Sequence, residues 1–150
     1  EDKNVELIEQ PLKTDELPLM KELKHVSPIP LIADENCLNA DDIPQLTDSF
    51  HGINIKLMKC GGCAEVPKMF KYANDSGLKV MLGCMVESSV GITAMSQFAS
   101  QADYLDLDGN LLINNDPYDG VKVQNGVPIL PDGSGLGLTL NSHGKIAGIK

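Results

Sequence analysis

Strand-like apolar runs that alternate with helix-like segments constrain the fold more than any other feature of this sequence. Five such runs each end at a charged residue, at Glu9, Asp34, Lys56, Glu87 and Asp106. These residues follow one another at intervals of about 20 to 30 positions, the length of one β/α unit. Helical patterns fill the intervals, at residues 14–26, 39–50, 63–74 and 88–99. The sequence therefore predicts an α/β fold with a parallel sheet, either open or closed as a barrel.

The acidic residues at the strand ends are expected to share one rim of the sheet. Glu9 and Asp34 are oxygen ligands of the kind that Mg²⁺ prefers, although strand-end carboxylates are also often solvated or cap the next helix. Glu35 should face away from Asp34, because neighbouring side chains in a strand alternate, and would support the site from outside or be structural. Asp106 and Asp108 should face the same way, so they either bind a cationic group together or are solvated.

Lys56 lies within an apolar run and is the candidate base. Its neighbours Ile55 and Leu57 are expected to deprive the amine of hydration and to lower its pKa toward neutrality. The alternative is an edge strand whose lysine faces water. On the rim, Lys56 could abstract a proton α to a carboxylate that is bound to a metal ion.

Composition narrows the function classes. The net charge is -9 and arginine is absent, which argues against a nucleic-acid partner. No apolar run approaches the ~20 residues of a membrane span, so no membrane partner is expected. The chain begins within charged sequence and without a methionine, which suggests an upstream part.

The four cysteines, Cys37, Cys60, Cys63 and Cys84, have irregular spacing, which indicates reduced thiols and a cytoplasmic location. The Cys60-Gly-Gly-Cys63 segment has the form of a redox or zinc motif. It lacks the second pair or the histidine cluster that such a site would need.

Four motifs, taken in order, resemble the enolase superfamily and its muconate-lactonizing subgroup. They are Glu9-Gln10-Pro11, Ala33-Asp34-Glu35-Asn36, Asn54-Ile55-Lys56-Leu57-Met58-Lys59 with Gly61-Gly62, and Asp106-Leu107-Asp108. The chain is most similar to dipeptide epimerases of the L-Ala-D/L-Glu type, from about residue 5 to residue 140.

The resemblance implies a modified TIM barrel whose capping domain is completed by the C-terminal segment. Residues 1–108 would form the later strands of the barrel, and residues 109–150 the capping segment and tail. Short alternating pieces near residues 120–123 and 127–130, separated by Gly and Pro turns, agree with a hairpin or cap there.

The resemblance also implies roles for individual residues. Glu9 and Asp34 would bind Mg²⁺, and Lys56 would be the acid/base lysine. Asp106 and Asp108 would hold the α-ammonium of a dipeptide substrate. The remaining assignments are that Cys84 and Val86 line the substrate, that Glu35 and Asn54 support the ligands, and that Lys59 lies outside the motif and is solvated.

Family members also use a first metal-binding aspartate and a second acid/base lysine from earlier strands, which this chain does not include. The expectation is therefore that the intact protein epimerises dipeptides through a metal-stabilised enolate and that these 150 residues alone are inactive. The alternatives are a cycloisomerase or o-succinylbenzoate synthase, or a non-catalytic half-barrel. A half-barrel would pair with a complementary chain or with a second copy through the exposed strand at residues 5–9.

Overall fold

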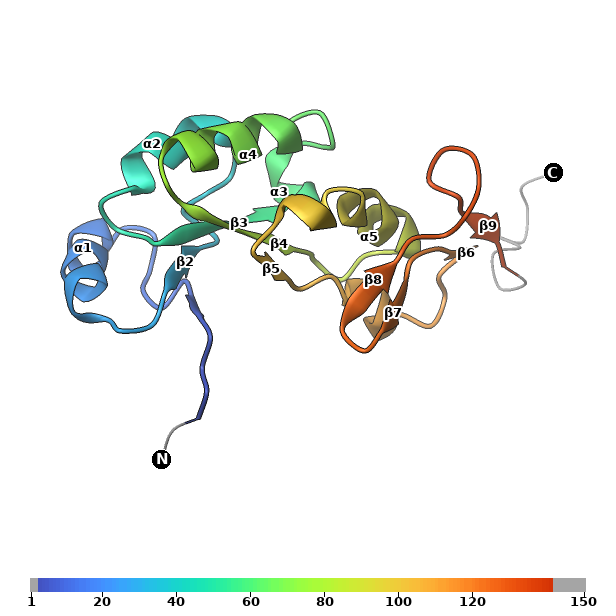
Figure 1. Cartoon of the computed structure of the whole chain (residues 1–150), viewed down its shortest axis with the longest axis horizontal. Coiled ribbons are helices and arrows are strands. Elements are labelled where there is room, and N and C mark those ends of the chain that lie inside the picture. Colours follow the sequence, from blue (N-terminus) through green and yellow to red (C-terminus); the bar gives the residue numbers. More distant parts are fainter. Residues whose placement is uncertain (1–2, 142–150) are drawn as a thin grey trace.

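A five-stranded parallel sheet forms the centre of the structure, a computed structural model that describes residues 3–141 (Figure 1). The strands pair in the order in which they occur in the sequence, and every neighbouring pair is parallel. They are β1 (Ile8–Glu9), β2 (Leu31–Ala33), β3 (Gly52–Lys56), β4 (Lys79–Gly83) and β5 (Tyr104–Leu105). This sequential order with helical crossovers is that of a barrel segment. The predicted α/β class and parallel sheet are confirmed.

The crossovers are helical, as the pattern predicts, but shorter and more broken. The helices are α1 (Leu17–Val26), α2 (Ile43–Leu46), α3 (Leu57–Cys60), α4 (Val66–Asp75) and α5 (Ser89–Ser96). Two 3₁₀ turns, η1 (Ala40–Asp42) and η2 (Ala99–Gln101), flank α2 and α5. The predicted helix at 63–74 begins later, at Val66, with Pro67 in its first turn, and the left-handed Gly61 (φ 85°) ends the short helix α3 before it.

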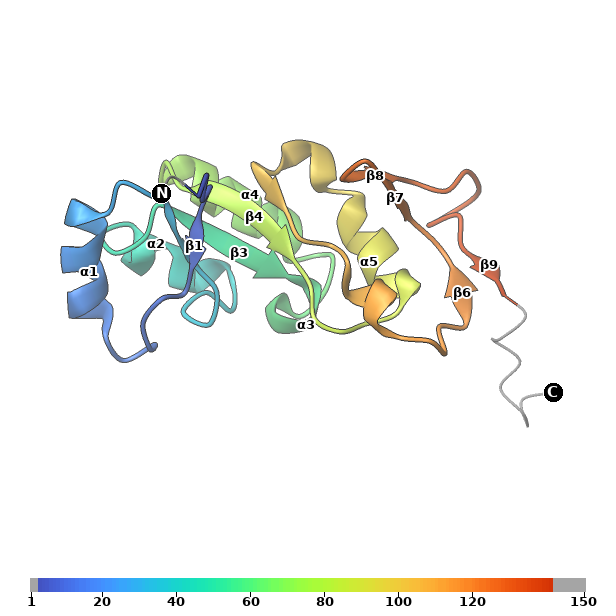
Figure 2. The same cartoon turned by 90° about the horizontal axis from the view of Figure 1, so that it is seen from below.

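Every second residue along the strands packs against the helices and contributes to the core. Figure 2 shows β1, β3 and β4 in front of α2 and α4, so these helices cover one face of the sheet. Alternate strand residues on that face are fully or almost fully buried: Leu31, Ala33, Ile53, Ile55, Val80 and Leu82. The residues between them therefore project from the opposite face, and these include the charged strand ends.

The segment after β5 forms small antiparallel pieces beside α5. Strands β7 (Lys122–Gln124) and β8 (Val127–Ile129) form a hairpin, which confirms the hairpin predicted there. Asn125 and Gly126 join them with φ values of 52° and 78°, as a two-residue turn requires.

The rest of the segment comprises the 3₁₀ turn η3 (Gly109–Leu112) and the antiparallel pair β6 (Tyr118–Asp119) and β9 (Thr139–Leu140). Val121 is buried in the main core, and its amide donates to Thr93 Oγ1 of α5 (2.9 Å). The assignment of residues 109–150 to a capping domain stays a prediction, and residues 142–150 lie outside the described part.

No helix within residues 3–141 has the length and apolar character that crossing a membrane requires.

Candidate active site at the carboxyl ends of the strands

Three of the predicted site residues meet at the carboxyl end of the sheet. Lys56, the last residue of β3, places its Nζ 2.5 Å from Asp34 Oδ2 and 3.4 Å from Glu9 Oε1. The strand register explains why these side chains lie together. Ile32 is level with Glu9 on β1 and with Gly52 on β3, and Asp34 and Lys56 follow at even spacings on the same face. Glu9, Asp34 and Lys56 thus share one face of three adjacent strands. The ammonium of Lys56 bridges two carboxylates.

The predicted direction of the Lys56 pKa is wrong. Burial does lower the pKa of Lys56, but the carboxylates of Asp34 and Glu9 outweigh it, and the pKa lies above the usual lysine value. For Asp34, burial raises the pKa, while hydrogen bonds from Lys56 and Lys59 lower it below the usual value. Ile55, which was expected to desolvate the amine, points to the other face of the sheet. The structure therefore holds Lys56 as an ammonium and Asp34 as a carboxylate.

Lys59 is buried at the site, whereas the resemblance predicts a solvated side chain. Only 8% of its side chain is exposed, and its Nζ donates to Asp34 Oδ1 and to the backbone oxygen of Asp34 (2.6 Å). It also donates to the backbone oxygens of Cys37 and Asn54, each at 3.2 Å. The reason is that α3 begins directly after Lys56, and its first turn brings Lys59 back over the ends of β2 and β3. A helix predicted to begin at Leu57 would place Lys59 in its first turn, close to the end of β3.

Asn54 supports Glu9 directly. Its side chain is fully buried, and its Nδ2 donates a 2.7 Å hydrogen bond to Glu9 Oε1. Gly83, the β4 residue level with Lys56, leaves room for this amide. A Cβ built on Gly83 would lie 2.5 Å from Asn54 Oδ1. Within the described residues, Asn54 Oδ1 has no hydrogen-bond partner.

The end of β4 differs from the prediction. The strand stops at Gly83, four residues before Glu87, so Glu87 is not the residue that concludes it. The apolar run continues past the last strand pairing, and the side chains of Met85 and Val86 are exposed (43% and 63%). Glu87 instead accepts a hydrogen bond from the amide of Met85 (3.2 Å).

Cys84 and the acidic pair after β5 lie near one another. Cys84 is half-buried, and its Sγ accepts a hydrogen bond from the amide of Gly109 (3.3 Å). Burial raises the pKa of its thiol, and the charges of Asp106 and Asp108 raise it further. The amide of Asp106 donates to Leu82 O (2.9 Å), which places Asp106 level with Gly83 and on the same face as Lys56.

Asp106 and Asp108 line a pocket of about 210 Å³, with apolar residues around them. Leu105 and Leu107 come from the same segment, and Val123, Gly126 and Pro128 come from the β7–β8 hairpin. The C-terminal hairpin thus stands beside the acidic pair, which combines negative charge with an apolar wall.

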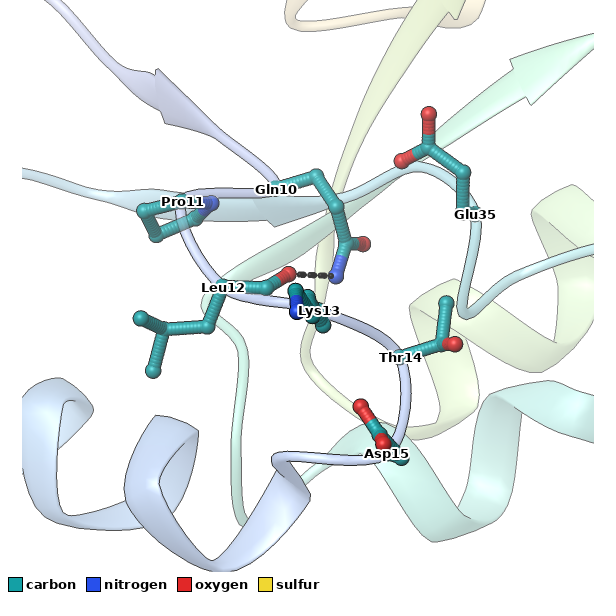
Figure 3. Close-up of a pocket in the computed structure, with 7 residues that line it drawn as sticks. All are labelled: Gln10, Pro11, Leu12, Lys13, Thr14, Asp15 and Glu35. Atoms are coloured by element: carbon teal, nitrogen blue, oxygen red, sulfur yellow. Dashed lines mark hydrogen bonds between the residues drawn. The ribbon is translucent and has the colours of Figure 1, made fainter.

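A wider open pocket lies next to the cluster, on the loop between β1 and α1 (Figure 3). Its volume is about 670 Å³, and it is lined by residues 10–15 and by Glu35. Glu35 is exposed here, beside and not within the Lys56 cluster. Gln10 joins the two strand ends: its Nε2 donates to Leu12 O and Asn36 Oδ1, and its Oε1 accepts from the amide of Asp34 (3.0 Å).

The donor set suits Mg²⁺. Mg²⁺ binds through one or two carboxylates and completes its shell with water or substrate oxygens. Glu9 and Asp34 provide two carboxylates from adjacent strands, each held by a neighbour on β3 or α3. Among residues 3–141, no three His, Cys, Asp or Glu side chains gather as a metal cluster. Cys60 is buried and Cys63 is exposed, and both are free thiols in the described part of the chain.

Parallel β/α units with paired carboxylates and a lysine at the strand ends define the rim of a β/α-barrel enzyme fold. The sequence profile described as "Enolase C-terminal domain-like" matches residues 1–144, and the chain belongs to that family. The chain is 46% identical to an L-Ala-D/L-amino acid epimerase of Maribacter sp. over 138 residues. That match covers 91% of this chain and 41% of the relative, so the chain spans about two fifths of the relative's length.

Solved structures agree with this assignment. The substrate-liganded L-Ala-D/L-Glu epimerase from Bacillus subtilis superposes with a TM-score of 0.82 at 31% identity, covering 89% of this chain and 39% of that one. A dipeptide epimerase from Methylococcus capsulatus, complexed with Mg and L-Arg-D-Lys, superposes with a TM-score of 0.82 at 33% identity, covering 89% and 40%. The predicted resemblance and the half-barrel fold are confirmed.

Proposed function

We propose that this chain is the later half of the barrel of a Mg²⁺-dependent dipeptide epimerase. The observation that carries the proposal is the position of Lys56 between Glu9 and Asp34, at the carboxyl ends of three adjacent strands. The family membership and the epimerases among the relatives support it. The activity would belong to the intact protein, because the chain spans only 41% of that relative.

Lys56 would carry the proton at the α-carbon of the substrate. As an ammonium it can deliver a proton, and as an amine it can accept one. Glu9 and Asp34 would hold Mg²⁺, which would supply positive charge beside the substrate carboxylate as the α-proton leaves. A second base for the opposite face of the α-carbon, and a further metal ligand, would come from outside this chain.

Asp106 and Asp108 would bind the α-ammonium of the dipeptide. Both carboxylates follow β5 on the rim, and both line the pocket beside the β7–β8 hairpin. A cationic group between two carboxylates gains charge-assisted hydrogen bonds. Substrates of a cycloisomerase or an o-succinylbenzoate synthase carry no such ammonium, so the acidic pair favours a dipeptide. Cys84 and Val86 would contact the substrate between this pair and Lys56.

The test is a substrate panel with the complete protein and Mg²⁺. It includes L-Ala-L-Glu, dipeptides with apolar or basic side chains, and the N-acetylated form of each, and chiral chromatography measures the product. We expect epimerisation of free dipeptides of the L-Ala-L-Glu kind and little turnover of the N-acetylated forms. If no dipeptide is epimerised, or if the N-acetylated forms react equally well, the proposal is wrong.

A further inference from the structure

Two lysines share the carboxylate of Asp34, and they hold it in different ways. Lys56 Nζ contacts Oδ2 at 2.5 Å, and Lys59 Nζ contacts Oδ1. The side chains of all three residues are largely buried, with exposed fractions of 13%, 8% and 9% for Lys56, Lys59 and Asp34. Each oxygen of the carboxylate therefore has its own cation.

Lys59 is held by the backbone as well as by Asp34. Besides Oδ1, its ammonium faces the backbone oxygens of Asp34, Cys37 and Asn54 at 2.6 to 3.2 Å. A lysine ammonium has three donors, so these acceptors use its whole hydrogen-bonding capacity. Moving Lys59 away would remove a donor from the backbone oxygens of Cys37 and Asn54 and from one oxygen of a buried carboxylate, whereas Asp34 O would keep its hydrogen bond from the amide of Cys37 (3.0 Å). Such groups are costly to leave unpaired.

The ammonium of Lys56 makes no such backbone contacts within the described residues. Both contacts of its ammonium in the described part of the chain are side-chain carboxylates, Asp34 Oδ2 and Glu9 Oε1. Another cation that neutralises these two carboxylates can replace it without exposing a carbonyl. A metal ion can therefore displace the ammonium of Lys56 from Asp34, whereas the ammonium of Lys59 stays in place.

We infer that Lys59 is a positioning residue that keeps Asp34 Oδ1 occupied, so that Asp34 presents only Oδ2 to an exchangeable cation. The inference rests on the Mg²⁺ site of the proposed function and adds a specificity to it. Mg²⁺ requires single oxygen ligands in a near-octahedral arrangement, whereas Ca²⁺ accepts carboxylates that bind through both oxygens. By withholding Oδ1, Lys59 makes the site favour Mg²⁺ over Ca²⁺.

The first test compares Mg²⁺ and Ca²⁺ affinities by calorimetry in the complete wild-type protein, in Lys59→Met and in Lys68→Met. Lys68 lies on the surface and is the matched control. Loss of one positive charge changes the affinities for Mg²⁺ and Ca²⁺ in the same direction. The ratio of the two affinities therefore reports whether Asp34 can bind the ion through both of its oxygens. We expect the preference for Mg²⁺ to fall at least about tenfold in Lys59→Met and to stay unchanged in Lys68→Met. An unchanged ratio in a folded Lys59→Met protein would overturn the inference.

The second test needs no variant and decides the matter if Lys59→Met does not fold. The wild-type protein is reductively methylated with and without Mg²⁺, and peptide mass spectrometry follows each lysine. We expect Lys59 to stay unmodified in both conditions, while Lys56 becomes several-fold more reactive with Mg²⁺. Equal reactivity of the two lysines, or a gain at Lys59, would contradict the inference.

The two proposals fail in different ways. If Mg²⁺ does not bind to the wild-type protein, the metal site of the proposed function is wrong and this inference falls with it. If Mg²⁺ binds and dipeptides are epimerised, but the ion preference is unchanged in Lys59→Met or Mg²⁺ makes Lys59 more reactive in the wild type, only the inference is wrong.

Discussion

Asn54 Nδ2 donates a 2.7 Å hydrogen bond to Glu9 Oε1, although the two residues are 45 positions apart in the sequence. The fully buried amide on β3 therefore sets the orientation of a carboxylate at the end of β1. If Glu9 binds Mg²⁺ as proposed, a carboxylate that is held in this way would lose little freedom on binding the ion.

Replacing Asn54 by Ala should weaken Mg²⁺ binding by about 10- to 100-fold, because Glu9 loses the group that orients it. Calorimetric titration of the complete protein measures the effect. The matched control is Asn74→Ala on the exposed surface of α4, which should bind Mg²⁺ as the wild type does. A folded Asn54→Ala protein with the wild-type affinity would show that Asn54 does not position Glu9.

Gly83→Ala should disturb the same contact from the opposite side. The added Cβ would lie within 3 Å of three atoms of the Asn54 side chain, so the amide must move. We expect a loss of about 1–3 kcal/mol in the free energy of unfolding, together with weaker Mg²⁺ binding.

A double-mutant cycle checks this mechanism. In an Asn54→Ala background the obstacle is gone, and Gly83→Ala should then cost much less. Denaturant unfolding of the two single variants and the double variant gives the coupling. Additive costs would mean that Gly83 is needed for another reason.

Asp106→Asn and Asp108→Asn should raise the KM for free dipeptides by about 10- to 100-fold, the cost of a lost hydrogen bond to a charged group. Substrates without an α-ammonium should be unaffected. Asp119→Asn, at an exposed position on β6, is the control. If free and N-acetylated dipeptides respond equally, the acidic pair does not recognise the ammonium.

The stability of the protein should fall as the pH decreases below 7, through His51. His51 Nδ1 accepts a hydrogen bond from the amide of Leu31 (3.0 Å). Burial lowers the pKa of His51, and the charges of Lys24 and Lys79 lower it further. The unfolded chain, with a histidine pKa of about 6.5, therefore binds a proton first, and stability is lost between that pH and the lower pKa of the folded state.

Urea unfolding at a series of pH values measures this loss. His51→Asn keeps an acceptor at a similar position and cannot be protonated, so its stability should depend less on pH in this window. His25→Asn is the control, because His25 is exposed on α1. The same pH dependence in His51→Asn and in the wild type would exclude this role for His51.

The sequence contains enough information to predict which residues meet at the carboxyl end of the sheet. Side chains alternate regularly along each strand, and the strands pair in the order of the sequence. Glu9, Asp34 and Lys56 each end an apolar run, and parallel pairing necessarily brings such ends to one edge. The four motifs add the family, which the sequence profile confirms.

The features that the sequence does not predict depend on contacts between residues that are far apart in the sequence. The pKa of Lys56 depends on Glu9 and Asp34 across the sheet and not on Ile55 beside it in the sequence. Lys59 reaches Asp34 only because α3 starts without an intervening loop. An apolar run also does not show where strand pairing stops, so the sequence extends β4 to Glu87 although the strand ends at Gly83.

Proton transfer by Lys56 is the central claim, and α-proton exchange tests it most directly. The complete protein, Lys56→Met and Lys68→Met are each incubated with L-Ala-L-Glu and Mg²⁺ in D₂O, and ¹H NMR follows the α-protons and the appearance of the epimer. We expect the wild type and Lys68→Met to convert the dipeptide with incorporation of deuterium at one α-carbon, and Lys56→Met to be slower by about 10²- to 10⁴-fold. A folded Lys56→Met protein that interconverts the epimers at the wild-type rate would contradict the account.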